Sequence, residues 1–125
     1  MIYQGSCHCK AITFEVEAPE HVEVVDCNCS MCAKAGFLHL IRPLSAFTLL
    51  TGQKAITSYT FNSGIAKHTF CKHCGVKPFY TPRSNPDGID INLRCLDPQP
   101  QSVSIEPFDG QNWEDNAASL AHKSH

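Results

Sequence analysis

The stretch Cys27-Asn28-Cys29-Ser30-Met31-Cys32 places three thiols within six residues, and the rest of the chain is organised around it. Two further cysteine clusters flank it, Cys7-His8-Cys9 before it and Cys71-Lys72-His73-Cys74-Gly75 after it. The flanking clusters together offer four sulfurs, the number that a closed tetrahedral zinc site needs, whereas a zinc with three protein ligands keeps one position open. The sequence therefore predicts one closed zinc site and a second site that lacks one protein ligand.

The length and composition predict one soluble domain. The 125 residues are 42% hydrophobic and 18% charged, which is ordinary for a globular protein. The formal net charge of −2, with scattered Lys and Arg residues, disfavours direct nucleic-acid binding. No apolar run approaches the ~20 residues that span a bilayer, and the N-terminus lacks a basic leader. We expect a single zinc-binding domain over 1–125, a cytoplasmic location and no membrane contact.

The expected location decides how the eight cysteines are interpreted. Reducing compartments disfavour disulfides, so clustered thiols there indicate metal ligation. Two zinc ions are the expected cofactors.

The hydrophobic pattern predicts many short strands separated by turns. The expected strands are 10–17, 22–25, 37–41, 47–50, 56–61, 65–70, 76–81, 89–93 and 103–108. The strands 56–61 and 65–70 form a hairpin across Asn62-Ser63-Gly64, and 89–93 alternates as a half-buried strand. Helices are expected only at 30–35, ended by Gly36, and at 112–122. The fold class is mainly β, with short antiparallel strands and little helix.

The Cys71-x-x-Cys74-Gly75 sequence is typical of a zinc knuckle, in which a tight turn directs both sulfurs at one metal. Cys7 and Cys9 are the natural second pair. Two sulfurs on one zinc lie about 3.8 Å apart, closer than alternate residues of a regular strand, so we expect a turn at Gly5-Ser6. A closed structural zinc on these four cysteines would join segments more than sixty residues apart, which stabilises a small domain.

Three interpretations remain open for Cys27, Cys29 and Cys32. They hold a second zinc whose fourth ligand is water or a substrate thiol, or Cys29 and Cys32 form a redox pair, or Cys95 or a histidine closes the site. Zinc lowers the pKa of a bound thiol, which suits the addition of a thiol to an aldehyde. The histidines in strand-like runs, His39 and His68, are expected to be packing residues.

The chain resembles the glutathione-dependent formaldehyde-activating enzyme family over roughly residues 3 to 114, the expected core of the domain. The three cysteine clusters with their neighbours carry the resemblance, from Gly5 to Cys9, from Cys27 to Cys32 and from Phe70 to Gly75. Within the family the chain is more similar to the branch that contains centromere protein V, on the residues Tyr59-Thr60-Phe61-Asn62, Ala66 to Cys71, Phe79 to Gly88, Cys95-Leu96-Asp97, Phe108-Asp109-Gly110 and Trp113-Glu114.

The resemblance implies a zinc-stapled β-tent, a structural zinc at Cys7, Cys9, Cys71 and Cys74, and a more labile zinc at Cys27, Cys29 and Cys32. It also implies a carbon–sulfur lyase or synthase like S-(hydroxymethyl)glutathione synthase, which acts on a glutathione-like thiol and a small aldehyde. The alternative function is a non-catalytic zinc module that binds a protein partner. A closed site that includes Cys95 would favour the alternative, and an open three-cysteine site would favour chemistry. Glutathione carries two carboxylates, which call for basic side chains; the candidates are Lys34, Arg42, Lys67, Arg83 and Arg94.

Overall fold

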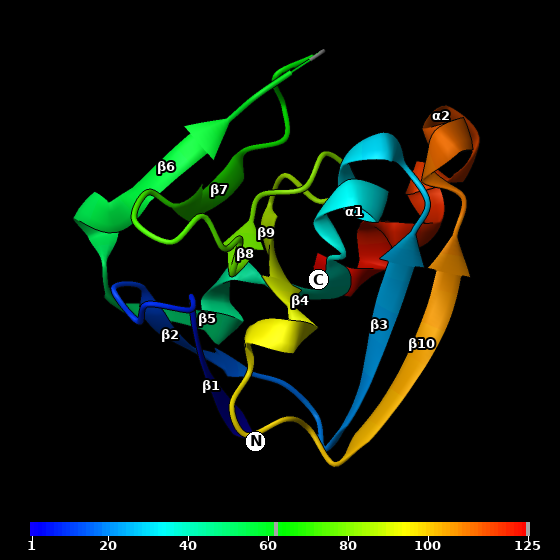
Figure 1. Ribbon diagram of the computed structural model, residues 1–125. Coiled ribbons are helices and arrows are strands. Elements are labelled where there is room, and N and C mark those ends of the chain that lie inside the picture. The colour runs from blue at the N-terminus through cyan, green and yellow to red at the C-terminus, as the bar shows by residue number, and fades with distance from the viewer. Residues whose placement is uncertain (62, 125) are drawn as a thin grey trace.

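The computed structural model describes residues 1–61 and 63–124 and shows a small, mainly β domain (Figure 1). Its strands are β1 (Ile2–Ser6), β2 (Thr13–Glu17), β3 (His21–Cys27), β4 (Leu38–Pro43), β5 (Phe47–Thr51), β6 (Ile56–Tyr59), β7 (His68–Cys71), β8 (Phe79–Tyr80), β9 (Gly88–Asn92) and β10 (Ser102–Phe108). The α-helices are α1 (Ser30–Ala35) and α2 (Trp113–Asn116), and 3₁₀ turns cover Leu44–Ala46, Gln53–Ala55, Leu93–Cys95, Gly110–Asn112 and Ala117–Ser124. Among these described helices none has the length and hydropathy that crossing a bilayer requires.

The first sheet has the order β1-β2-β5 and is antiparallel throughout. Its inner face carries Phe14 and Val16, which are fully buried, as the alternating pattern predicts. Gly5 pairs with Phe14 across the ladder, and a Cβ on Gly5 would lie 2.3 Å from the Phe14 ring. The expected turn at Gly5-Ser6 is therefore wrong: both residues belong to β1, and Gly5 is needed so that the Phe14 ring can lie over the backbone.

The second sheet has the order β10-β3-β4-β9-β8. Its other strand pairs are antiparallel as predicted, whereas the edge pair β3–β10 is parallel, because the 93–101 connection returns the chain to the end of the sheet at which β3 begins. The expected alternation in β9 is also wrong. All five of its residues are buried, including Asp90 at 1% exposure, because β9 lies between β4 and β8 and is covered on both faces.

The third sheet is the two-stranded hairpin β6–β7, which projects from the rest of the domain (Figure 1). Its pairing confirms the predicted hairpin, although the strands are shorter than expected. Gly64 adopts a φ of +71°, as expected of this turn, and Asn62 lies outside the described residues. The strand expected over 76–81 is reduced to β8, because the backbone of Lys77 and Pro78 bonds instead to Asn92, through its side-chain amide and its N–H.

The C-terminal segment does not form the single helix expected over 112–122. It is divided into a 3₁₀ turn, the short helix α2 and a second 3₁₀ segment. The buried amide of Asn85 donates to the carbonyl of Leu120 and to Oγ of Ser124, so this segment is anchored against the β8–β9 connection. Ser124 is 5% exposed as a result. This packing brings Trp113 and Leu120 to the edge of the cavity described below.

Candidate functional site

The first cysteine group consists of Cys7 and Cys9, which follow β1, with Cys71 at the end of β7 and Cys74 in the turn after it. All four Sγ atoms lie within 4.8 Å of one another. The Cys7–Cys9 and Cys9–Cys71 sulfur distances are 3.7 and 3.6 Å, close to the ~3.8 Å between sulfurs on one tetrahedral zinc. The donor set and its spacing therefore fit a closed zinc site.

Two tight turns direct these sulfurs at one point. In the second, Gly75 has a φ of +77° and its N–H donates to the Cys71 carbonyl at 2.8 Å. In the first, the Lys10 N–H donates to the Cys7 carbonyl at 3.3 Å and Lys10 has a φ of +63°, so the turn contains the cysteine pair instead of preceding it. The backbone N–H groups of Ile12 and His73 each donate to a sulfur, of Cys7 and Cys71 respectively, at 3.4 Å. Such bonds favour the thiolate, the form that a metal needs.

The second group consists of Cys27 at the end of β3, Cys29 as the N-cap of α1, and Cys32 inside α1. Their three Sγ atoms also lie within 4.8 Å of one another. The helix and its stop at Gly36, which has a φ of +66°, are as predicted. The Cys32 N–H donates to the Cys29 sulfur at 3.3 Å, so the helix cap itself orients one of the three sulfurs.

The three sulfurs of the second group share their protons unequally. Hydrogen bonds from the side chains of Cys27 and Cys32 lower the pKa of the Cys29 thiol to about 2. Hydrogen bonds with the side chain of Cys27 and, to a smaller extent, with that of Cys29 raise the pKa of the Cys32 thiol well above its ordinary value. Three sulfurs within 4.8 Å of one another are a donor set for a divalent metal such as zinc, which displaces thiol protons when it binds. This group also fits zinc.

The chain after β10 closes over the second group. The Asn28 N–H donates to the Phe108 carbonyl at 3.1 Å, and the Gln111 N–H donates to the Asn28 side-chain oxygen at 2.9 Å. These bonds bring Gly110 so near that a Cβ there would lie 2.3 Å from the Cys27 sulfur. Gly110 was not identified as a site residue from the sequence, because a glycine more than eighty residues away carries no local signal of this contact.

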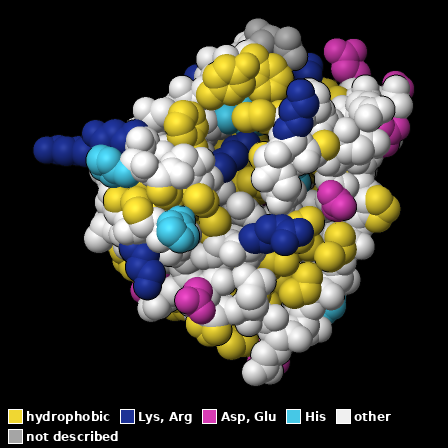
Figure 2. Space-filling view, in the orientation of Figure 1, with side chains coloured by type: hydrophobic (Ala, Val, Ile, Leu, Met, Phe, Trp, Pro, Cys, Tyr) yellow, Lys and Arg dark blue, Asp and Glu magenta, His cyan; other side chains and the backbone are white. Residues whose placement is uncertain are grey.

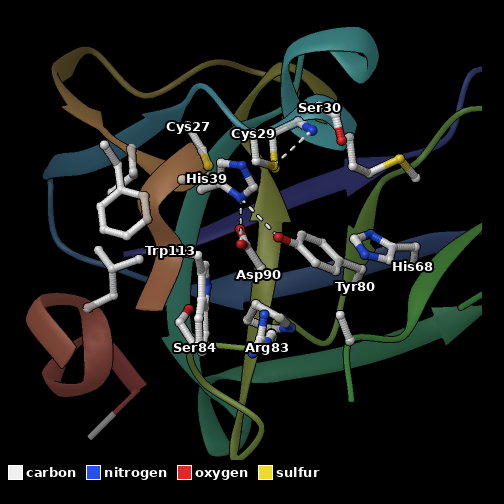
Figure 3. A pocket seen from close by; sticks show the side chains of 18 of the residues that line it. Cys27, Cys29, Ser30, His39, His68, Tyr80, Arg83, Ser84, Asp90 and Trp113 are labelled. Atoms are coloured by element: carbon white, nitrogen blue, oxygen red, sulfur yellow. Dashed lines mark hydrogen bonds and ion pairs between the residues drawn. The ribbon is translucent and has the colours of Figure 1, made fainter. Parts of the chain in front are cut away.

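The second group lies at one end of a cavity of about 400 Å³, which is within the size range of small-molecule sites (Figure 3). Hydrophobic and aromatic side chains from the second sheet, the β6–β7 hairpin and the C-terminal segment form most of its wall. Those considered further below are Phe61, His68, Tyr80, Phe108 and Trp113. Cys95 belongs to neither cysteine group and lines a different cavity, together with Cys7 and Arg94. Its side chain therefore lies on the side of the first group.

A buried acid–base pair faces the same cavity. His39 Nδ1 lies 2.6 Å from Asp90 Oδ2, with the two side chains 5% and 1% exposed. In Figure 3 the His39 ring lies between Asp90 and the side chains of Cys27 and Cys29. Within the described part of the chain, His39 Nε2 and Asp90 Oδ1 are buried without a hydrogen-bond partner. A carboxylate on Nδ1 fixes the proton there and leaves a lone pair on Nε2.

The sequence predicted only a packing role for His39. The pairing of His39 with Asp90 was missed because the two residues are 51 positions apart in sequence and come together only where β4 pairs with β9. Such a pair is costly to bury without function or compensation.

A stack of rings forms another wall of the cavity. His68 lies between Phe61 and Tyr80, with ring centroids 5.2 and 4.8 Å away and interplanar angles of 19° and 15°. The Lys77 ammonium lies 2.6 Å from His68 Nδ1 and 3.8 Å from the centroid of the Tyr80 ring. Burial lowers the pKa of Lys77 to about 8, and burial with the nearby Lys77 charge lowers the pKa of His68 to about 4. His68 therefore packs as predicted, but as part of the cavity.

The five basic candidates for binding substrate carboxylates separate clearly in the structure. Only Arg83 lines the cavity beside the second group. Arg42 donates to the Glu17 carbonyl, and Arg94 lines the cavity beside Cys7. Lys34 and Lys67 are exposed and line neither of these cavities.

Comparisons with known proteins agree with this geometry. A family model described as glutathione-dependent formaldehyde-activating enzyme matches residues 2–113. The crystal structure of a Rhodobacter sphaeroides protein is similar with a TM-score of 0.72 and 31% sequence identity, over 82% of this chain and 99% of that chain. The matched region includes both cysteine groups and the wall of the cavity as far as Trp113.

Proposed function

Because the chain belongs to the family of glutathione-dependent formaldehyde-activating enzymes, we propose that it is a zinc-dependent carbon–sulfur lyase or synthase. It joins a thiol to a small aldehyde, or reverses that step, as S-(hydroxymethyl)glutathione synthase does. One observation carries the proposal: the three-sulfur group opens onto a cavity that also contains the buried His39–Asp90 pair. A metal site and a positioned base in one pocket are what this reaction requires.

The two cysteine groups have separate roles in this proposal. Cys7, Cys9, Cys71 and Cys74 hold a structural zinc with four protein ligands. Cys27, Cys29 and Cys32 would hold the second zinc, with three protein ligands instead of the four of a closed site. When bound there, zinc supplies Lewis acidity that lowers the pKa of a thiol at neutral pH.

His39 moves the proton. Its Nε2 accepts the proton of the substrate thiol while Asp90 holds the Nδ1–H and stabilises the imidazolium. The thiol sulfur forms a bond to the aldehyde carbon, the carbon–oxygen π bond breaks, and His39 returns the proton to the new hydroxyl oxygen. The product is a hydroxyalkyl thioether with all atoms of both substrates, so no oxidant or reductant is needed. The reverse sequence makes the same protein a lyase.

The proposal is tested with the zinc-loaded chain, ¹³C-labelled formaldehyde and a thiol. We expect native mass spectrometry to find two zinc ions and exchange NMR to find the thiol–formaldehyde reaction accelerated. His39→Gln should lower the acceleration roughly 10²-fold, the usual contribution of a general base, and should retain both metals. A single zinc ion, or exchange that is unaffected by the protein, would refute the proposal.

The alternative is a non-catalytic module that binds a protein partner. It is favoured by apolar side chains gathered on the β6–β7 hairpin, where Tyr59, Phe61 and Ile65 are 51%, 37% and 48% exposed (Figure 2). The residues that resemble the centromere protein V branch include Tyr59 and Phe61, so we place the chain in that branch as part of the same proposal. A zinc-loaded protein that neither binds nor turns over thiols at millimolar concentration would favour this alternative.

A further inference from the structure

The charge of the cavity wall is the starting point for identifying the substrate. Among the described residues that line the cavity, Arg83 is the only Lys or Arg. The buried acid, Asp90, is occupied by His39, and two more acids lie at the edge: Glu114, 86% exposed and 3.8 Å from Arg83, and Asp109, between the lining residues Phe108 and Gly110. The Lys77 ammonium contacts the His68 and Tyr80 rings but does not itself line the cavity. Among the described lining residues, Arg83 is therefore the cation available to a ligand, and it suits one carboxylate.

Glutathione fits this wall poorly. Glutathione carries two carboxylates and an ammonium group. A desolvated carboxylate forms stronger hydrogen bonds with charged donors than with neutral ones. The remaining polar groups on the wall are neutral, chiefly the hydroxyls of Ser30, Ser63 and Ser84 and the amide of Gln111. A second carboxylate would therefore meet neutral donors or the acidic edge.

Arg83 is arranged to receive a carboxylate. Its guanidinium carbon lies 3.7 Å from the centroid of the Trp113 ring, so the ring covers one face of the guanidinium. Stacking of this kind leaves the N–H groups, which lie in the guanidinium plane, available for a bidentate contact. Glu114 reaches only one nitrogen, at 3.8 Å, which is too long for a hydrogen bond.

The wall between Arg83 and the three sulfurs carries aromatic rings together with the buried His39–Asp90 pair. Phe61, His68 and Tyr80 contribute the ring stack, and Phe108 and Trp113 belong to the C-terminal part of the chain. Rings of this kind pack best against a flat apolar body. Figure 3 shows the labelled part of this arrangement, with Cys27 and Cys29 at one end and Arg83 and Trp113 at the other.

We propose that the thiol substrate has an aromatic or similarly flat apolar body, with its sulfur at the Cys27–Cys29–Cys32 end and a single carboxylate at Arg83. This inference rests on the proposed thiol–aldehyde function and specifies its substrate class. The hydrophobic body, and not the peptide groups of glutathione, supplies most of the binding.

Thiol binding to the full-length chain with cobalt(II) in the second site tests this, because sulfur coordination changes the visible spectrum. The probes are 4-(mercaptomethyl)benzoate, benzyl mercaptan, which lacks the carboxylate, and glutathione. We expect 4-(mercaptomethyl)benzoate to reach half-saturation at a concentration at least tenfold lower than glutathione. Arg83→Gln should weaken its binding about tenfold and leave benzyl mercaptan unchanged, whereas the matched change Arg94→Gln, beside the other cavity, should affect neither.

The failures of the two proposals are distinguishable. Glutathione binding as tightly as 4-(mercaptomethyl)benzoate, or a carboxylate preference that survives Arg83→Gln, refutes the substrate class and leaves the thiol function intact. A spectrum that no thiol changes refutes the thiol function and the substrate class together.

Discussion

The two cysteine groups differ in where their sulfurs come from along the chain. The first joins β1 to the turn after β7, and its Cys9 and Cys71 sulfurs are 62 residues apart in sequence. The second takes all three sulfurs from residues 27–32. Emptying the first group would release a long chain segment, whereas emptying the second would leave the connectivity of the fold unchanged.

Their surroundings differ in the same sense. In the first group, Cys7 and Cys71 belong to the main hydrophobic core, while Cys9 is exposed; in the second group, Cys27 and Cys32 are buried but lie outside that core. The second group faces a cavity that contains the buried His39–Asp90 pair. Within the described residues, one nitrogen of His39 and one oxygen of Asp90 have no hydrogen-bond partner. A closed donor set in a core contributes to stability, and an incomplete one beside unsatisfied polar groups is suited to chemistry.

The largest expected effect separates the groups directly. Cys71→Ser should leave the protein unfolded at room temperature, because metal-linked folding energy of roughly 10 kcal/mol is comparable to the whole stability of a small domain. The matched change Cys29→Ser should give a folded protein with one zinc ion. Circular dichroism and native mass spectrometry measure both outcomes, and loss of both metals from the Cys29 variant would show that the assignment of roles is wrong.

A second variant tests the incomplete group without altering a sulfur. In Gly110→Ala the added methyl group would lie 2.3 Å from the Cys27 sulfur. The variant should therefore lose the metal of the second group and retain the metal of the first group. Gly64→Ala is the control, since its Cβ meets no atom of the described residues within 4 Å and introduces backbone strain at a φ of +71°. Zinc quantified after gel filtration distinguishes one ion from two. Two retained ions in the Gly110 variant would mean that the loop after β10 adjusts freely.

How much of this comparison could be predicted from the sequence depends on how local each signal is. The cysteine groupings, α1 and the hairpin were predictable, because each rests on spacing within a few residues or on a turn such as the one at Gly64. The role of Gly5 was misjudged, because a glycine in a turn and a glycine under a Phe14 ring look the same in sequence.

The cavity could not be predicted from the sequence, because the residues that line it are far apart in the chain and come together only in the folded structure. His39 and Asp90 become partners through the β4–β9 register, and Lys77 reaches His68 only because the turn holding Cys74 folds back. Burial of β9 on both faces removed the alternation that its polar residues suggested.

A smaller effect concerns acid. His68 has a folded pKa of about 4 and an ordinary value of 6.5, so the unfolded state binds more protons between these pH values and stability falls as pH decreases from 6.5 to 4. His68→Phe keeps the ring stack and removes the titration, so it should lose less stability over this window, by on the order of 2 kcal/mol. Urea midpoints at pH 7 and pH 4.5 measure the difference. Both proteins carry the same cysteines, so acid release of metal affects them equally, and parallel pH profiles would contradict the assigned burial.

The smallest effect concerns the turn of the first group. Lys10 is an exposed residue with a φ of +63°, a conformation that costs a residue with a Cβ roughly 1 kcal/mol and glycine almost nothing. Lys10→Gly should therefore raise the free energy of unfolding by about 0.5 kcal/mol after the greater entropy of glycine in the unfolded chain is subtracted. Lys10→Ala removes the same charge without relieving the backbone and should give no gain in the same thermal unfolding measurement. Equal stabilisation by both variants would assign the effect to charge, and a change in the second metal's occupancy would mean that the two groups are not independent.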